Sequence, residues 1–264
     1  MRKIIDVSEF NGLIDWAQAA PHIDGAILRA GYRGYGSAGT LVRDSQFAKN
    51  LIEIKRLKIP WGAYFLTQAV SESEAQAEAD FVQSVIGDTA PLGVWLDSEY
   101  GEPNALGRAD RLSKAARTAF AMAFLREAKR LGQTAGLYCA ADWYRTVIDG
   151  ASIKAAGFKV WLASVENVKP SVPYDCWQYT WLGSVPGIKG NVDISFFSDE
   201  IGGKSVSKYY TDTNGHWAEK AIDRMRDEGL MNGKTETTFA PDAPITRAEI
   251  ATVFSRLLDK LDGK

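Results

Sequence analysis

The sequence predicts an α/β fold: a barrel of eight strands with helices around its first part and a helix-poor closing part, followed by a small, mostly α-helical C-terminal module. Short apolar segments alternate with longer helical patterns from residue 3 to about 200, which is typical of parallel strands joined by crossover helices. The last three apolar segments leave little room for helices between them. Residues 201–208 are mostly small or polar, a composition typical of flexible segments. This indicates a linker between a domain at 1–200 and a module at 209–264.

Eight short apolar segments are the strand candidates: 3–8, 25–30, 61–67, 93–96, 135–139, 159–163, 175–179 and 190–194. Residues 44–57, 71–85 and 112–131 carry apolar side chains at helical spacing and fall between the earlier segments. This order favours a closed barrel over an open doubly wound sheet. In the module, helices are predicted at 216–228 and 246–261.

The bulk composition excludes several classes of partner. Lysine and arginine total 31 against 33 acidic residues, a net charge of -2, so no basic field favours nucleic acid or an anionic membrane. Apolar runs end within about ten residues, whereas a bilayer span needs about 20, so no membrane insertion is expected. After Met1-Arg2-Lys3 the apolar run is only Ile4-Ile5, so no signal peptide is expected. With two histidines and two cysteines, interpreted as buried thiols at Cys139 and Cys176, we expect no metal and no other cofactor.

Polar residues at the strand ends are the candidates for chemistry, because barrels of this type place catalytic residues at the C-terminal ends of their strands. They are Asp6, Ser8, Arg29, Tyr64, Asp97, Glu99, Tyr138, Gln178 and Asp193. Strand alternation puts Trp95, Asp97 and Glu99 on one face, so the last two form a carboxyl pair. Such a pair beside aromatic rings cannot easily ionise twice, which leaves one proton available near neutral pH, as glycoside hydrolysis requires.

An Asp-x-Glu after a strand is also common as two solvated loop acids. Asp6 and Asp193 arrive at the same rim from the first and last strands, which are neighbours in a closed barrel. The convergence of four acidic residues at one rim favours an active site at Asp97 and Glu99.

An ordered set of fragments resembles glycoside hydrolase family 25, the lysozymes of phages and of some bacteria and fungi. The fragments are Ile5-Asp6-Val7-Ser8, Leu28-Arg29-Ala30-Gly31, Asp44 with Phe47 and Asn50, Gly62-Ala63-Tyr64, Leu96-Asp97-Ser98-Glu99, Trp177-Gln178-Tyr179 and Val192-Asp193. The resemblance covers residues 1 to about 200. It implies an irregular eight-stranded (β/α) barrel of TIM-like type that cleaves the β-1,4 bond between N-acetylmuramic acid and N-acetylglucosamine in peptidoglycan. It also implies that Glu99 is the general acid.

For Asp97 the resemblance implies a position beside the N-acetyl group of the substrate. Either the acetamido oxygen attacks the anomeric carbon while Asp97 stabilises the oxazolinium, or a water or a carboxylate attacks directly. The short Asp-x-Glu spacing is similar to that of substrate-assisted hexosaminidases, and we favour that mechanism. Asp6 and Asp193 then position the sugar, Tyr64 and Gln178 donate hydrogen bonds, and Arg29, Tyr138 and Trp177 complete the predicted substrate contacts.

Other functions have weaker support. A chitinase-like hexosaminidase usually keeps a further Asp two residues before the Asp-x-Glu, where this chain has Trp95. The segment 34–39 fits G-x-G-x-x-G, but the helix begins only near Asp44 and no acid ends a second strand, so we interpret it as a loop that shapes a sugar groove. Ser8 and Ser98 have no histidine nearby and neither lies in G-x-S-x-G, so the sequence does not favour a serine hydrolase. A non-catalytic wall-binding protein on a barrel scaffold is the alternative from another class.

Residues 209–262 resemble the S-layer homology motif. The matching fragments are Tyr210-Thr211-Asp212, His216-Trp217-Ala218, Ala221-Ile222, Gly229-Leu230-Met231-Asn232-Gly233, Thr238-Phe239-Ala240-Pro241 and Ile245-Thr246-Arg247-Ala248-Glu249. Thr246 and Glu249 also fit a capping box at the start of the second helix. The resemblance implies secondary cell-wall polymer as ligand, with Arg247 and Trp217 as the binding candidates.

Such motifs usually come three in a row, and this chain has one. One hypothesis is therefore a homotrimer that assembles through 209–262, and the alternative is a module packed on its own barrel. The expected partners are peptidoglycan glycan strands and secondary wall polymer. The expected site of action is the cell wall, which a phage or prophage endolysin reaches through a holin and a bacterial enzyme reaches by another export route.

Overall fold

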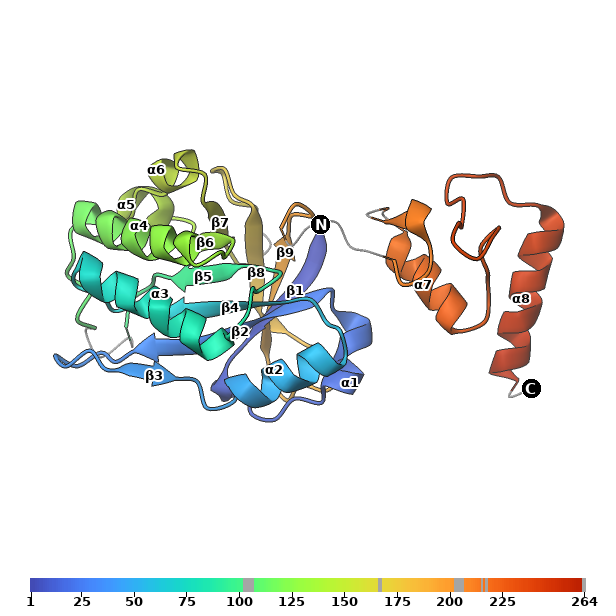
Figure 1. Ribbon diagram of the computed structural model, residues 1–264, viewed down its shortest axis with the longest axis horizontal. Coiled ribbons are helices and arrows are strands. Elements are labelled where there is room, and N and C mark those ends of the chain that lie inside the picture. The colour runs from blue at the N-terminus through green and yellow to red at the C-terminus, as the bar shows by residue number, and fades with distance from the viewer. Residues whose placement is uncertain (102–106, 166–167, 202–206, 215, 217, 263–264) are drawn as a thin grey trace. The chain divides into compact units, whose positions relative to one another are not determined.

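The computed structural model describes residues 1–101, 107–165, 168–201, 207–214, 216 and 218–262. The chain divides into two compact units, Met1–Gly202 and Gly203–Lys264. The first is built around a sheet and the second from helices and turns (Figure 1). No helix in the described ranges is long and apolar enough to cross a membrane.

The first unit is a closed barrel. Its strands are β1 (Arg2–Val7), β2 (Gly25–Arg33), β3 (Leu41–Arg43), β4 (Trp61–Leu66), β5 (Val94–Asp97), β6 (Ala135–Ala140), β7 (Lys159–Ala163), β8 (Cys176–Gly183) and β9 (Val192–Phe197). Neighbours follow the order β1-β9-β8-β7-β6-β5-β4-β2, and a parallel pairing of β1 with β2 closes the ring. The short β3 pairs antiparallel with β2 and extends the sheet beyond the ring. The predicted eight-stranded barrel is confirmed, and β3 is an addition to it.

The last strand, β9, runs opposite to the direction predicted for it. It is antiparallel to both β8 and β1, although the other strands of the ring pair in parallel. Only eight residues, 184–191, separate β8 from β9. A short connection suits antiparallel neighbours, because a parallel neighbour needs a crossover of about a dozen residues or more. As a result β9 begins, rather than ends, at the rim where β1 ends, and Asp193 pairs with Asp6 in the register.

The helices cover the outer face of the barrel in its first part (Figure 1). They are α1 (Trp16–Ala19), α2 (Phe47–Arg56), α3 (Glu72–Ile86), α4 (Lys114–Arg130), α5 (Trp143–Thr146) and α6 (Gly150–Ala155), with 3-10 turns η1 (Glu9–Asn11) and η2 (Ala20–His22). The three predicted helices are confirmed as α2, α3 and α4. Ser71 and Ser113 begin α3 and α4 as N-caps, because their hydroxyls accept hydrogen bonds from backbone amides inside the helix. The described residues between β7 and β9 form no helix, which agrees with the helix-poor closing part.

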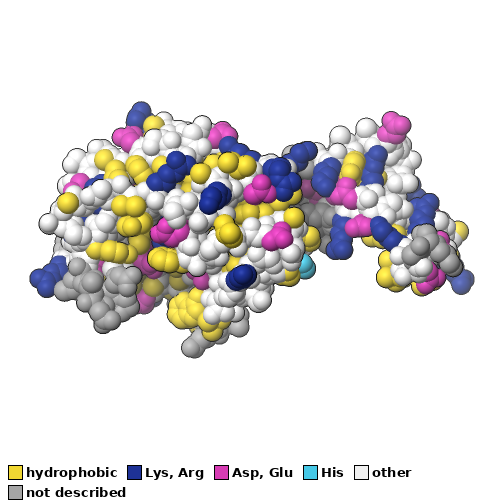
Figure 2. Space-filling model, turned by 90° about the horizontal axis from the view of Figure 1, so that it is seen from below, with side chains coloured by type: hydrophobic (Ala, Val, Ile, Leu, Met, Phe, Trp, Pro, Cys, Tyr) yellow, Lys and Arg dark blue, Asp and Glu magenta, His cyan; other side chains and the backbone are white. Residues whose placement is uncertain are grey.

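Two apolar layers hold the barrel together. The outer layer lies between the strands and the helices and includes Phe65 and Phe124. The inner layer fills the ring, where Trp95, Trp161 and Phe197 meet edge to face with ring centroids 5.1 to 5.5 Å apart. These three buried rings form a solid floor beneath the rim that carries the polar residues. On the face seen in Figure 2, basic and acidic side chains are intermixed around small apolar patches.

The second unit contains a 3-10 turn, η3 (Thr211–Thr213), and two helices, α7 (Glu219–Asp227) and α8 (Arg247–Leu261). The predicted helix at 216–228 is therefore shorter, and the one at 246–261 is present. Thr246 and Glu249 form the predicted capping box at the start of α8. The buried centre of the unit is small: Tyr210 is 1% exposed, and its hydroxyl accepts a hydrogen bond from the Gly233 amide at 2.7 Å.

Candidate active site

Polar side chains from six strands meet at one rim of the barrel and line a cavity of about 280 Å³. They are Asp6 (β1), Tyr64 (β4), Asp97 and Glu99 (the end of β5 and just after it), Tyr138 (β6), Gln178 (β8) and Asp193 (β9). The C-terminal ends of the parallel strands share this rim with the start of β9. The structure thus brings together seven of the residues singled out from the sequence.

A larger cavity of about 630 Å³ adjoins the first. Both are lined by Tyr64, Asp97, Glu99 and Asp193, so the two form one groove with the carboxyl groups at its middle. Three exposed aromatic side chains line this groove: Phe10 and Tyr100 in the larger cavity and Trp181 in the smaller. Aromatic faces of this kind offer flat apolar surfaces for the C–H faces of sugar rings.

Asp6 and Asp193 form a carboxyl pair. Burial, followed by the charge of Asp193, raises the pKa of Asp6 well above its usual range, and burial also raises the pKa of Asp193. The charge of one carboxyl group thus disfavours ionisation of the other, so the pair does not easily carry two charges. Gln178 Nε2 donates to Asp6 Oδ2 at 3.0 Å, and Tyr138 Oη donates to Gln178 Oε1 at 2.8 Å. This chain of hydrogen bonds fixes one wall of the smaller cavity.

Asp97 ends β5 and is 6% exposed. Burial, then the charges of Glu99 and Asp6, raises the pKa of Asp97 well above its usual range. Among the described residues none donates a hydrogen bond to Oδ1 of Asp97, although that atom is buried. A buried acceptor without a donor is costly. The residue lines both cavities of the groove.

Glu99 follows β5 and remains accessible to solvent at the surface of the groove. The surrounding walls still remove much of the hydration of its carboxyl group. This desolvation, together with the charge of Asp193, raises the pKa of Glu99 to about 7. Glu99 is therefore the carboxyl group that a ligand can reach and that is partly protonated at neutral pH, which is what a general acid needs.

Two tyrosines complete the wall around the carboxyl groups. Burial raises the pKa of Tyr64 and of Tyr138 well above the usual range. Both hydroxyls therefore stay protonated; Tyr138 already donates to Gln178, and Tyr64 can donate to a ligand in the groove.

Arg29 lies in the wall of the larger cavity, but two of its nitrogens are bound within the protein. Nε donates to Asp44 Oδ2 and Nη2 to Glu9 Oε1, each at 2.8 Å. The rings of Phe10 and Tyr32 lie 4.8 and 5.5 Å from its guanidinium carbon. β2 continues to Arg33, so Arg29 is inside the strand rather than at its predicted end. Its position favours a supporting role for the groove wall.

Trp177 does not line either cavity of the groove, in contrast to the prediction. Successive side chains of a strand point to opposite faces, and Gln178 takes the inner one. The Trp177 ring instead packs near Tyr179, and Nε1 donates to Ser164 O at 2.7 Å. Trp181 lines the groove because a bulge between Gln178 and Thr180 shifts the alternation of β8. The sequence carried no signal for that bulge.

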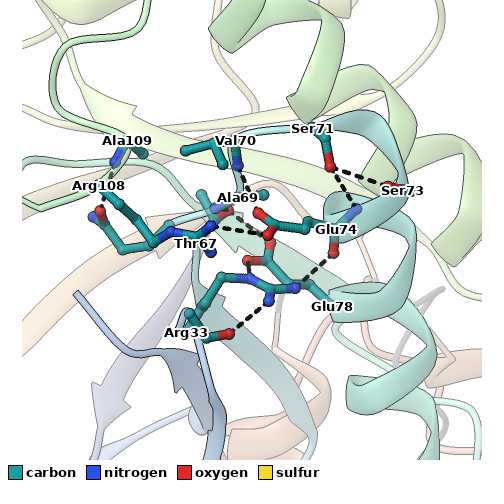
Figure 3. Close-up of polar contacts among 12 residues, drawn as sticks. Arg33, Thr67, Ala69, Val70, Ser71, Ser73, Glu74, Glu78, Arg108 and Ala109 are labelled. Atoms are coloured by element: carbon teal, nitrogen blue, oxygen red, sulfur yellow. Dashed lines mark hydrogen bonds and ion pairs between the residues drawn. The ribbon is translucent and has the colours of Figure 1, made fainter. Parts of the chain in front are cut away.

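The glycine-rich loop after β2 is supported by a buried ion pair (Figure 3). Arg33 Nε donates to Glu78 Oε1 at 2.7 Å, and Nη1 donates to Gly39 O, also at 2.7 Å. Thr67 Oγ1 donates to the other oxygen of Glu78 at 2.6 Å. Tyr35, which follows Arg33 in this loop, lines the larger cavity. The loop therefore shapes the groove, as interpreted from the sequence, while Arg33 anchors it from inside.

The residues predicted to bind wall polymer belong to the second unit. Arg247 is the first residue of α8 and is exposed. Trp217 lies outside the described residues. Within the described ranges no three His, Cys, Asp or Glu side chains are arranged to hold a metal ion, and Cys139 and Cys176 are buried free thiols.

Two family models match the chain. Glycosyl hydrolases family 25 matches residues 5–188, and the S-layer homology domain matches residues 209–251. Among curated proteins, lysozyme M1 of Streptomyces globisporus is 27% identical over 204 residues, covering 74% of this chain and 67% of that protein. Cell surface glycoprotein 1 of Acetivibrio thermocellus is 41% identical over 66 residues, covering 25% of this chain and 3% of that protein.

Solved structures resemble the barrel unit as well. The modular autolysin LytC of Streptococcus pneumoniae, in complex with a synthetic peptidoglycan ligand, superposes with a TM-score of 0.64 at 26% identity, covering 74% of this chain and 46% of that one. A lysozyme of Streptomyces coelicolor gives 0.63 at 26% identity, covering 74% of this chain and 91% of that one. The chain thus spans about half the length of the autolysin and nearly all of this lysozyme.

Proposed function

The chain belongs to glycosyl hydrolases family 25 and carries an S-layer homology domain, and we propose that it is a lysozyme that cleaves the β-1,4 bond between N-acetylmuramic acid and N-acetylglucosamine in peptidoglycan. The observation that carries the proposal is the groove with a reachable, partly protonated Glu99 beside the buried Asp97.

Purified Gram-positive cell walls are the test substrate. Loss of turbidity with release of new reducing ends supports the proposal, and intact walls at micromolar enzyme contradict it.

Glu99 acts first as general acid. It gives its proton to the glycosidic oxygen as the bond to the anomeric carbon breaks, so that the leaving sugar departs as a neutral alcohol. The resulting carboxylate then accepts a proton from the water that attacks the anomeric carbon in the second step. A pKa of about 7 suits both directions, because the group is neither a strong acid nor a strong base at neutral pH.

Asp97 assists the acetamido group of the muramic acid residue. Its carboxyl group, which lines the groove, accepts the amide N–H and so orients the acetamido oxygen for attack on the anomeric carbon. The positive charge of the oxazolinium then forms beside the carboxyl group of Asp97. Asp6 and Asp193 position the sugar, and Tyr64, Tyr138 and Gln178 supply hydrogen bonds from the walls.

Substrate assistance predicts a dependence on the N-acetyl group. Peptidoglycan with free amines on its muramic acid residues is expected to be cleaved about 10²-fold more slowly or worse, because the intramolecular nucleophile is missing. The initial rate of reducing-end release measures this. The same preparation after chemical re-N-acetylation is the control and should recover the rate. Equal rates on both preparations would exclude substrate assistance and favour direct attack by water.

The second unit attaches the enzyme to the wall. Arg247 and Trp217 are the proposed contacts to secondary cell-wall polymer: the guanidinium group of Arg247, at the start of α8, offers several donors to an anionic sugar substituent. The second unit would thus hold the barrel unit at its substrate.

The same unit is proposed to assemble three chains into a homotrimer. The support is α8, which has no buried residue and exposes Phe254 and Leu258 at 59% each and Leu261 at 76%. Association would bury these apolar side chains. Light scattering at high micromolar concentration is expected to give the mass of three chains, and Leu258→Lys is expected to lower it to that of one. A monomeric native chain under these conditions would favour a unit packed on its own barrel.

A further inference from the structure

The residues on both sides of Glu99 are held by one region of α4 and α5. Ser98 is 1% exposed, and its hydroxyl lies 3.4 Å from Nη1 of Arg117, a residue of α4. On the other side, the ring of Tyr100 meets the ring of Trp143 edge to face, with centroids 4.5 Å apart. The guanidinium carbon of Arg117 lies 4.8 Å from the centre of the same Trp143 ring. Arg117 thus contacts Ser98 directly and Tyr100 through Trp143.

Arg117 also binds the chain where it returns to the barrel. Its Nη2 donates to the carbonyl oxygen of Ala109 at 2.7 Å. The next residue, Asp110, accepts hydrogen bonds from the amides of Gly101 at 3.1 Å and Gly107 at 2.7 Å. Hydrogen bonds to Asp110 therefore connect Gly101, which follows Glu99 closely in the sequence, to the segment 107–110.

Arg117 is a buried cation, and its burial costs free energy of folding. The residue is 4% exposed, and no carboxylate in the described part of the chain lies within ion-pair distance of its nitrogens. A buried charge normally requires a paired or hydrogen-bonded environment. Here the hydrogen bonds to Ser98 and Ala109 and the aromatic face of Trp143 supply part of it, while Nε has no hydrogen-bond partner among the described residues.

We propose that Arg117 is a positioning residue that places the Glu99 carboxyl group in the groove through Ser98 and through Trp143 and Tyr100. This inference rests on the proposed role of Glu99 as general acid. A general acid must lie within hydrogen-bond reach of the oxygen it protonates, and a displacement of about 1 Å can cost about 10²-fold in rate. Arg117 does not touch the groove itself, since it lines neither of its cavities.

Arg117→Met in the full chain tests the proposal. We expect kcat on cell walls to fall about 10- to 100-fold, with KM changed by less than about threefold, because the groove walls stay in place while the acid is displaced. We also expect the alkaline limb of the pH profile to move to lower pH, because a displaced Glu99 gains hydration. Arg117→Lys keeps the charge but loses the planar fork, and we expect a smaller loss of kcat.

Arg126→Met is the matched control, because Arg126 lies on the same helix and is exposed. Its kcat and pH profile should equal those of the native chain. Native kcat and an unmoved alkaline limb in folded Arg117→Met overturn the inference. If Arg117→Met does not fold, Arg117→Lys decides by the same two readouts. Full activity of Glu99→Gln would instead overturn the role of Glu99 as general acid, and intact walls with the native chain would overturn the proposed function, so the failures can be told apart.

Discussion

Replacing Glu99 with glutamine is expected to lower kcat on peptidoglycan by about 10²- to 10⁴-fold. Glutamine keeps the size of the side chain and its place in the groove but has no proton to give to the leaving oxygen. The measurement is the initial rate of reducing-end release from purified walls. Binding to the walls should be little changed, because the walls of the groove and the second unit are untouched.

Glu53→Gln is the matched control. Glu53 is an exposed partner of Arg56 on α2, outside the groove, so this variant should keep native activity. Native activity in Glu99→Gln would move the acid to another residue. A native chain that binds walls without cleaving them would support the alternative of a wall-binding protein on a barrel scaffold.

The pH profile of the native chain follows from the same group. The first step needs Glu99 protonated, and its pKa is raised to about 7 by desolvation and by the charge of Asp193. The rate should therefore fall as the pH rises through about 7. A rate that stays constant up to pH 9 would contradict the assignment of Glu99 as acid.

Replacing Arg33 with methionine is expected to lower the free energy of unfolding by about 3 to 5 kcal/mol, the usual cost of removing one partner from a buried ion pair. Glu78 is 0% exposed and would keep the hydroxyl of Thr67 (Figure 3) and the backbone amide of Gln68 as its hydrogen-bond donors. Arg33 also binds the carbonyl oxygens of Gly39 and Glu74. The loop that carries Tyr35 would lose its anchor as well.

The loss should depend on pH in a defined direction. Burial raises the pKa of Glu78 to about 7 even with Arg33 present, and removal of Arg33 raises it further. At pH 5 Glu78 is neutral, so only the hydrogen bonds of Arg33 are lost and the cost is smaller. At pH 8 the unpaired carboxylate must be buried or take up a proton, so the cost is larger. Urea unfolding at both pH values measures this. Arg56→Met, which breaks an exposed pair, should change little at either pH, and an equal loss for Arg33→Met at pH 5 and 8 would contradict the explanation.

Much of the site was predictable because the end of a strand can be recognised in the sequence as a polar residue after a short apolar run. Asp6 and Asp97 each end a short apolar run, and the barrel brings those ends to one rim. Asp193 was placed at the correct rim although β9 runs the other way, because the start of an antiparallel strand and the end of a parallel one meet there. The short connection 184–191 was the signal that could have predicted that direction.

Side-chain direction was less predictable. Strand alternation leaves Trp177 outside the groove, and a bulge in β8 after Gln178 brings Trp181 into it. No pattern of residue types predicts that bulge. Arg29 was predicted to contact substrate, yet Asp44 pairs with it inside the protein, as Glu78 does with Arg33. Their partners come from distant segments and depend on tertiary packing. The same is true of Arg117, which lies 19 residues from Ser98 in the sequence.

In the second unit, local signals were sufficient for local structure. The capping box at Thr246 and Glu249 depends on residues three positions apart and is present as predicted. The S-layer homology match confirms the resemblance. Self-association and polymer binding depend on surfaces rather than on local pattern, so they stay proposals.

The identity of the new reducing end tests the central claim most directly. Purified Gram-positive peptidoglycan is digested with the native chain, the products are reduced with borohydride, and the sugar alcohols are identified by mass spectrometry. Cleavage after N-acetylmuramic acid predicts N-acetylmuramitol. N-acetylglucosaminitol as the main product would contradict the muramidase assignment.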